Sequence, residues 1–119
     1  MPLTLPGALL RLEGLVAAAA AVALFVHGDY SWWLFAALAL APDLSFAFYA
    51  AGPRVGALGY DVAHTEALPV ALGAVGVLAG WNGAVALALV WLMHIGVDRA
   101  LGYGLKYPTA FRDTHLSRV

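Results

Sequence analysis

The sequence predicts an all-α integral membrane protein, a four-helix bundle forming a single transmembrane domain over residues 1–119. Hydrophobic residues make up 63% of the chain and charged residues only 11%, whereas soluble domains carry about 25% charged residues. The apolar residues fall into four stretches, each close to the roughly 20 residues that span a bilayer. The net charge of −1 and the absence of cysteine argue against nucleic acid as a partner and exclude disulfides and cysteine-ligated metals.

The first helix is predicted over about residues 7–26. Pro6 suits the start of a helix, because the N–H that proline lacks would have no partner in the first turn. Arg11 and Glu13 lie near the beginning of this stretch. The alanine run at 17–21 that follows is thin enough for a neighbouring helix to approach closely.

The second helix is predicted over about residues 31–51, with Ser31 as its N-cap. Trp32 and Trp33 then lie where interfacial aromatic residues are found in membrane proteins. Pro42 falls inside this span and is expected to kink it or open its hydrogen-bond ladder. Asp43 is therefore predicted to lie beside freed backbone groups within the membrane.

The third helix is predicted over about residues 61–80, after a loop that begins at Gly52 and leads through Tyr60 into the helix. His64 would lie one turn into it. The fourth helix is predicted over about residues 83–105 and carries His94, Asp98 and Arg99. A polar tail, residues 106–119, follows it.

The basic residues give the orientation of this bundle. All six lie at the amino end, in the loop between helices two and three, or toward the carboxyl end: Arg11, Arg54, Arg99, Lys106, Arg112 and Arg118. The other two turns have none. By the positive-inside rule, both termini are predicted to be cytoplasmic.

Two carboxylates and two imidazoles are predicted to share the cytoplasmic half of the membrane: Asp43, His64, His94 and Asp98. His94 and Asp98 are four residues apart, so they share one face of a helix. Ionisable groups in a membrane cost about 2.5–3.5 kcal/mol each, and by default they mark a functional site. Because imidazole and carboxylate suit zinc or manganese, the four residues are candidate ligands of a divalent metal and are expected to face inward.

Other polar residues have candidate roles around this site. Glu13 could act as a catalytic base or an additional ligand, and Arg99 or Lys106 could bind an anionic headgroup, with Tyr60 as a further substrate-binding candidate. Arg99 could instead form a structural ion pair with Asp98 or Glu13. Glu66 should point away from His64, because residues two apart lie on different sides of a helix. His115 is expected to be solvated.

Several motifs follow one another in a fixed order: Arg11-Leu12-Glu13, Ala41-Pro42-Asp43-Leu44-Ser45, Gly52-Pro53-Arg54-Val55-Gly56, Tyr60 with His64-Thr65, the run from His94 to Pro108, and Asp113-Thr114-His115-Leu116. In this order the sequence resembles the bacterial membrane family called domain of unknown function 4260. The resemblance covers nearly the whole chain. It implies a four-helix protein of the bacterial inner membrane and no particular activity.

A weaker resemblance is to the LexA-regulated membrane-bound metal-dependent hydrolases, which have a Pro-Asp step, a His-x-x-Thr-His motif and a His-x-x-x-Asp motif. The matching residues here are Asp43, His64, His94 and Asp98. Ser45 stands where that family usually has a second aspartate, and Tyr60 stands near the position of its first histidine. The resemblance therefore implies a metal site with a reduced ligand set.

These observations leave three functional hypotheses. The first is a membrane-embedded metal-dependent hydrolase that acts on a lipid or a lipid-linked ester or phosphoester. The second is a non-enzymatic binding or transport subunit whose intramembrane charges form a buried ion-pair or proton-relay network. In the third, the cluster only fixes the register of the helices. A homo-oligomer, most simply a dimer, is expected through alanine- and glycine-rich surfaces of the first or third helix.

Overall fold

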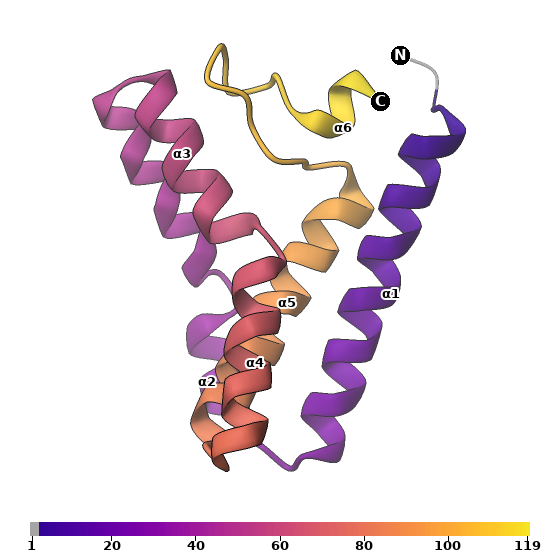
Figure 1. Ribbon diagram of the computed structural model, residues 1–119, viewed down its shortest axis with the longest axis vertical. Helices are drawn as coiled ribbons and strands as arrows, with labels where there is room; N and C mark the ends of the chain where they lie inside the picture. The colour runs from indigo at the N-terminus through magenta and orange to yellow at the C-terminus, as the bar shows by residue number, and fades with distance from the viewer. Residues whose placement is uncertain (1–2) are drawn as a thin grey trace.

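The protein is described by a computed structural model that covers residues 3–119 and contains no strand in that range. The first helix, α1 (Leu5–His27), begins at the N-cap Thr4, whose hydroxyl accepts a hydrogen bond of 3.1 Å from the backbone N–H of Gly7. It is a single unbroken helix. The prediction of a first membrane-length helix is therefore confirmed (Figure 1).

The second apolar span is broken, as Pro42 predicted. It consists of α2 (Trp32–Leu38) and a 3₁₀ helix, η1 (Ala41–Ala51). The ladder is interrupted because Pro42 has no backbone N–H to donate to a carbonyl one turn earlier. The N–H of Asp43, the helical partner of the Ala39 carbonyl, bonds to the carbonyl of Leu40 at 3.0 Å instead, so the Ala39 carbonyl is free to accept a hydrogen bond from a side chain.

The third span is also broken, and here the predicted boundaries are wrong. The structure has α3 (Pro53–His64) and α4 (Ala67–Ala79), so most of the predicted loop before residue 61 is helical. Gly52 supplies a backbone φ of 105°, which glycine adopts readily, and Pro53 then starts a helix. The range 61–80, predicted as one helix, thus contains the end of α3, the extended residue Thr65, and α4. His64 is the last residue of α3 instead of lying one turn into a helix.

The fourth span is one helix, α5 (Asn82–Leu101). It ends a turn before the predicted residue 105, because Gly102 adopts a left-handed φ of 96° and caps the helix. The remaining chain folds back across the bundle. It forms an isolated antiparallel bridge between Lys106 and Thr114 and a last short helix, α6 (His115–Arg118).

Glycines allow the helices to approach closely. Gly14 of α1 and Gly96 of α5 face each other, and a Cβ atom built on Gly96 would lie 2.5 Å from the carbonyl oxygen of Gly14. Gly76 of α4 packs in the same way against Val85 of α5. As a result, α5 is the central helix, with α1 and α4 both packed on it, while η1 and α3 pack mainly on each other.

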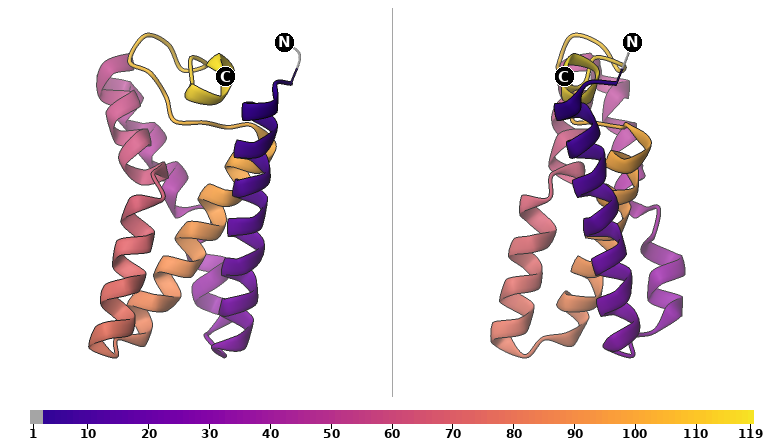
Figure 2. Two further views of the ribbon diagram at one scale, coloured as in Figure 1. Left: turned by 45° about the vertical axis from the view of Figure 1, so that its right-hand side comes forward. Right: turned by 90° about the vertical axis from the view of Figure 1, so that its right-hand side faces the viewer.

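The helices are long and apolar enough to cross a membrane four times. When the two broken helices are each counted as one, the spans are Leu5–His27, Trp32–Ala51, Pro53–Ala79 and Asn82–Leu101. The start of α1, the turn between η1 and α3, and α6 lie at one end of the molecule, and the other two turns lie at the opposite end (Figures 1 and 2). This arrangement agrees with the predicted all-α fold of four membrane-length helices.

Candidate metal centre

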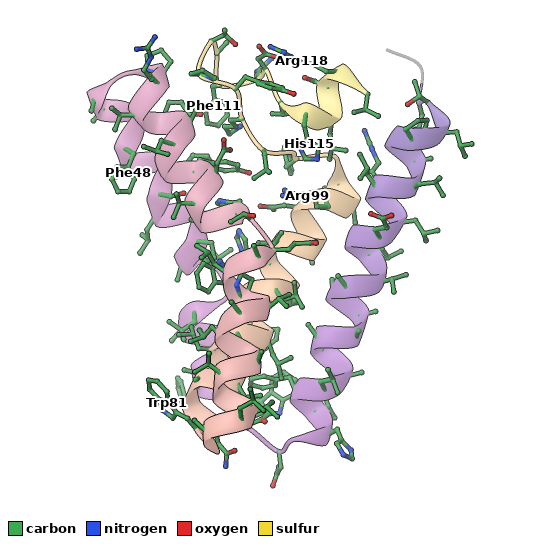
Figure 3. All side chains as sticks on the ribbon, in the orientation of Figure 1. Phe48, Trp81, Arg99, Phe111, His115 and Arg118 are labelled. Carbon is green, nitrogen blue, oxygen red and sulfur yellow. The ribbon has the colours of Figure 1, made fainter. Side chains whose placement is uncertain are left out.

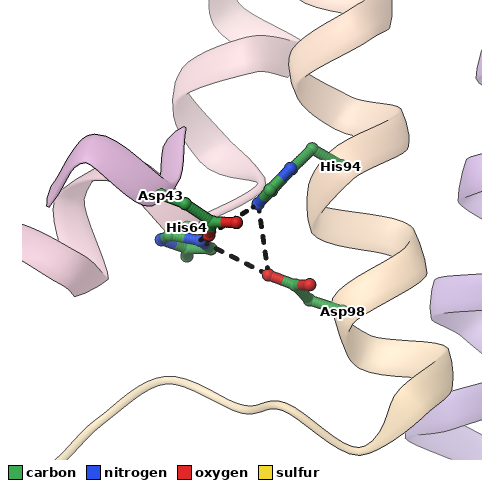
Figure 4. Close-up of side chains that lie close together, drawn as sticks. All are labelled: Asp43, His64, His94 and Asp98. Atoms are coloured by element: carbon green, nitrogen blue, oxygen red, sulfur yellow. Dashed lines mark hydrogen bonds and ion pairs between the residues drawn. The ribbon is translucent and has the colours of Figure 1, made fainter. Parts of the chain in front are cut away.

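The four candidate ligands meet at one point, as predicted. One ligand atom from each of Asp43, His64, His94 and Asp98 lies within 4.8 Å of the others (Figure 4). The Nε2 atom of His64 is 3.2 Å from Oδ1 of Asp43 and 3.4 Å from Oδ2 of Asp98. The Nε2 atom of His94 is 3.1 Å and 3.3 Å from the same two oxygens.

The helix breaks bring these residues together. His94 and Asp98 are one turn apart on α5 and project from the same face. His64 is the last residue of α3, beside the break before α4, and Asp43 lies in the first turn of η1, beside the break after α2. Two interrupted spans and one continuous span therefore supply the four side chains.

The other ring nitrogen of each histidine is held by a backbone carbonyl. The Nδ1 atom of His94 is 2.6 Å from the carbonyl oxygen of Ala39, and the Nδ1 atom of His64 is 2.9 Å from that of Tyr60. A carbonyl can only accept, so both Nδ1 atoms must carry the proton and donate. Metal-binding histidines are oriented by the same kind of contact, which leaves Nε2 as the ligand atom.

These contacts place acceptor atoms opposite one another. In neutral imidazoles protonated at Nδ1, both Nε2 lone pairs point at the oxygens of Asp43 and Asp98. Lone pairs at 3.1–3.4 Å from each other repel unless positive charge lies between them. Two added protons or one divalent cation would supply that charge.

The spacing fits a single small metal ion. In a tetrahedral site with metal–ligand bonds of about 2.0–2.1 Å, neighbouring ligand atoms are about 3.3–3.4 Å apart. The four imidazole–carboxylate separations, 3.1–3.4 Å, are close to this value, and the other two pairs of ligand atoms lie within 4.8 Å of each other. The side chains could therefore hold an ion with little movement.

The site is buried on the imidazole side and open on the carboxylate side. The side chains of His64 and His94 are 0% and 5% exposed, whereas those of Asp98 and Asp43 are 18% and 35% exposed. Both carboxylates line a cavity of about 300 Å³. The other lining residues come from η1, α3 and the C-terminal segment, and they are Phe46, Tyr60, Tyr103, Lys106 and Phe111.

Tyr60 and Lys106, the predicted substrate-binding residues, both line this cavity. The Tyr60 ring stacks on the imidazole of His64 with centroids 3.7 Å apart. The Lys106 ammonium donates to the carbonyl of Phe111 at 2.7 Å and lies over the rings of Phe111 and Tyr60. Burial lowers the pKa of Lys106. Contact with a substrate remains a prediction for both residues.

Arg99 does not form the predicted ion pair. Its guanidinium donates to the carbonyl of His64 at 2.8 Å and to the carbonyl of Tyr103 at 3.2 Å. Within residues 3–119, no ion pair joins Arg99 to Asp98 or Glu13. The carbonyl of His64, the last residue of α3, lacks a helical partner, and the carbonyl of Tyr103 lies just beyond the end of α5. These two carbonyls accept from two of the five N–H groups of the guanidinium. Arg99 therefore positions His64 through its backbone.

Glu13 lies away from the four ligands, so it is not placed to be an additional ligand or a base at this centre. It is exposed and lines a second cavity of about 240 Å³ together with Glu66, Arg99 and His115. Glu66, predicted to point away from His64, is exposed and lines this second cavity, which none of the four ligands lines. His115 is half-buried instead of solvated, because its Nδ1 accepts a 2.8 Å hydrogen bond from the backbone N–H of Leu105.

Sequence reasoning missed the residues that fix the helices around the site. The indole of Trp91 donates to the carbonyl of Ala63 at 2.6 Å, which ties the last turn of α3 to α5. Asp61 accepts the backbone N–H of Lys106 at 2.6 Å and ties the C-terminal segment to α3. Asp61 was visible as a further ionisable residue one turn before His64 on the predicted path of the chain. Trp91 gave no such indication.

Comparison with known proteins places the chain in a family without assigning it an activity. No curated protein and no solved structure matches the chain. The family described as "Domain of unknown function (DUF4260)" matches residues 7–119, which is nearly the whole sequence. The chain therefore belongs to the DUF4260 family.

Proposed function

We propose that this protein is a membrane-embedded hydrolase that uses one divalent metal ion, zinc or manganese, to cleave a lipid or a lipid-linked ester or phosphoester. One observation carries the proposal: two histidines whose Nδ1 atoms are held by backbone carbonyls turn their Nε2 atoms toward two carboxylates at 3.1–3.4 Å. The cavity beside the carboxylates gives a substrate access to that point.

The exposure of each candidate ligand indicates its role in the proposed reaction. When bound, the metal would supply an activated water, whose pKa falls to about 7 on zinc. His64, His94 and Asp98 are the less exposed ligands, and three protein ligands are the usual number in a catalytic zinc site. Asp43 is the most exposed of the four and lines the cavity, so its carboxylate can accept a proton from that water. Lys106 and the aromatic residues would then orient the substrate.

The proposed location is the bacterial inner membrane, with both termini in the cytoplasm. The distribution of Lys and Arg supports this orientation, and in this topology the cluster lies in the cytoplasmic half. A homodimer remains a further proposal. The small residues Gly14 and Gly76 pack against α5 within one chain, so a dimer would use other surfaces of α1 and α4. Mass measurement in mild detergent would decide its presence.

The test is metal analysis of the purified protein and of two histidine variants. We expect about one ion per chain after incubation with zinc or manganese, and loss of that ion in His94→Ala. His27→Ala is the matched control, because His27 is exposed at the far end of α1. Helix content by circular dichroism shows whether each variant is folded. A folded wild-type protein that takes up no ion would refute the metal site.

A second measurement separates hydrolysis from binding. The metal-loaded protein would be incubated with a panel of carboxylic and phosphoric esters of lipids, and product formation followed. Hydrolysis lost in His94→Ala but kept in His27→Ala supports an enzyme.

The alternative function is metal or proton transfer without catalysis. It is favoured by the fact that four protein ligands can complete a tetrahedral shell, as in closed structural zinc sites. Metal uptake into protein-containing vesicles, with no product from any ester, would establish this alternative.

A further inference from the structure

Two separate cavities, one polar and one apolar, lie along α5. A polar cavity of about 240 Å³ lies at the end that carries the C-terminal segment, and an apolar cavity of about 320 Å³ lies nearer the α1–α2 turn. Both are lined by residues from α1, α4 or the residues just before it, and α5. The apolar cavity is lined by residues that include Leu24, Val70, Gly73, Val77, Leu89 and Leu92. Neither cavity contains a ligand of the candidate metal centre.

The polar cavity combines opposite charges. Glu13 and Glu66 line it with their carboxylates, and Arg99 lines it with a guanidinium. His115 lies there too, and because its Nδ1 accepts from Leu105, the neutral ring carries its proton on Nε2 and can donate. Figure 3 shows Arg99 and His115 between α1 and α3, at the end of the molecule that carries the C-terminal segment. With a neutral His115, the cavity has one excess negative charge and therefore favours a ligand that brings a cation.

The distance between the cavities matches a membrane lipid. Glu13 and Leu24 lie on α1, eleven residues apart, which is about 16 Å along a helix. One leaflet occupies half of a hydrocarbon core of about 30 Å. A lipid headgroup in the polar cavity could therefore extend one acyl chain into the apolar cavity.

We infer that these two cavities together bind one phospholipid whose headgroup carries a primary ammonium. The ammonium contacts Glu13 and Glu66, and the phosphate contacts Arg99. A quaternary ammonium has no N–H to donate to the carboxylates, and an anionic headgroup without an amine would leave both carboxylates unpaired. The inference depends on the membrane location proposed above and is independent of metal binding and hydrolysis.

The test compares three lipids that share the same acyl chains: phosphatidylethanolamine, phosphatidylcholine and phosphatidylglycerol. Each is titrated into the purified full-length protein in mild detergent, and bound lipid is counted by native mass spectrometry. We expect one phosphatidylethanolamine per chain, bound about tenfold more tightly than either other lipid. The double variant Glu13→Gln/Glu66→Gln should lose this preference. Asp29→Asn, which changes a carboxylate in the distant α1–α2 turn, should keep it.

A second variant tests the apolar cavity. Gly73→Leu places a side chain in the space that Gly73 lines and should reduce retention of all three lipids. Unchanged circular dichroism shows that a variant is folded. The inference would be overturned if the wild-type protein bound no lipid, bound the three lipids equally, or formed a lipid-free dimer. It would also be overturned if the double glutamine variant kept the same preference.

Discussion

Substituting Gly96 with alanine tests whether α1 is held against α5 by direct backbone contact. The new Cβ atom would lie 2.5 Å from the carbonyl oxygen of Gly14 and 2.7 Å from the backbone nitrogen of Ala18. Ordinary contact begins at 3.4 Å, so α1 must move by about 1 Å to relieve the overlap. Both atoms belong to the backbone of α1 and cannot move aside as a flexible side chain could.

The free energy of unfolding should fall by about 2 kcal/mol. Overpacking a well-packed contact costs about 1–3 kcal/mol, and we take the upper end because two backbone atoms are involved. Replacing glycine by alanine in a helix returns about 1 kcal/mol through helix propensity. Unfolding in mixed detergent micelles, followed by circular dichroism, measures the difference.

Gly83→Ala is the matched control, since the nearest atom to its added Cβ is 3.4 Å away. It should be neutral or slightly stabilising. The metal content of folded Gly96→Ala should stay at the wild-type value, because Gly96 faces α1 whereas His94 and Asp98 face η1 and α3. If Gly96→Ala is as stable as the wild type, or if Gly83→Ala costs as much, α1 is not packed on α5 in this way.

Three further predictions concern the breaks and the C-terminal segment. Burial and the nearby Arg99 lower the pKa of His115 from its usual 6.5. The C-terminal segment should therefore stay docked above pH 6.5 and undock more readily below it, because the imidazole binds a proton once it is released. Limited proteolysis of the segment should become faster as the pH falls, but not in His115→Asn, which keeps an acceptor for the N–H of Leu105. Trp91→Phe removes one hydrogen bond to a backbone carbonyl and should lower unfolding free energy by about 1 kcal/mol, whereas Trp33→Phe, at an exposed position, should not. Pro42→Ala permits a continuous second helix, in which the Ala39 carbonyl that orients His94 would accept a helical hydrogen bond instead. The variant should therefore bind zinc more weakly, as measured by competition with a chelator. Unchanged zinc affinity would contradict the role of the Ala39 carbonyl in orienting His94.

The sequence was sufficient to predict that the four candidate ligands, Asp43, His64, His94 and Asp98, lie close together. The i, i+4 spacing on α5 placed His94 beside Asp98, and the depth of Asp43 and His64 followed from the orientation of the spans. Pro42 identified the break in the second span correctly. These inferences held because each depended on a local rule, either helical spacing or the missing N–H of proline.

The predicted ends of the helices were less accurate. The Gly52-Pro53 pair predicts a loop, although glycine followed by proline also starts helices. Gly102 ended α5 through a left-handed cap. The role of Arg99 could not be predicted, because one of its partners is the carbonyl of His64, which is freed by a break that the sequence did not indicate. Glu13 was assigned to the centre on depth alone, and depth does not determine the direction in which a side chain points.

The breaks in the second and third spans also divide the molecule into two parts, one formed by η1 and α3 and the other by the remaining helices. η1 and α3 pack mainly on each other and lean away from α1 (Figure 2), and they join the other helices through residues 39–40 and 65–66. Asp43 and His64 belong to this pair, whereas His94 and Asp98 belong to α5. A divalent ion bound by all four would therefore act as a cross-link across a hinge. Its release would leave Arg99, Trp91 and the C-terminal segment to hold the two parts in register.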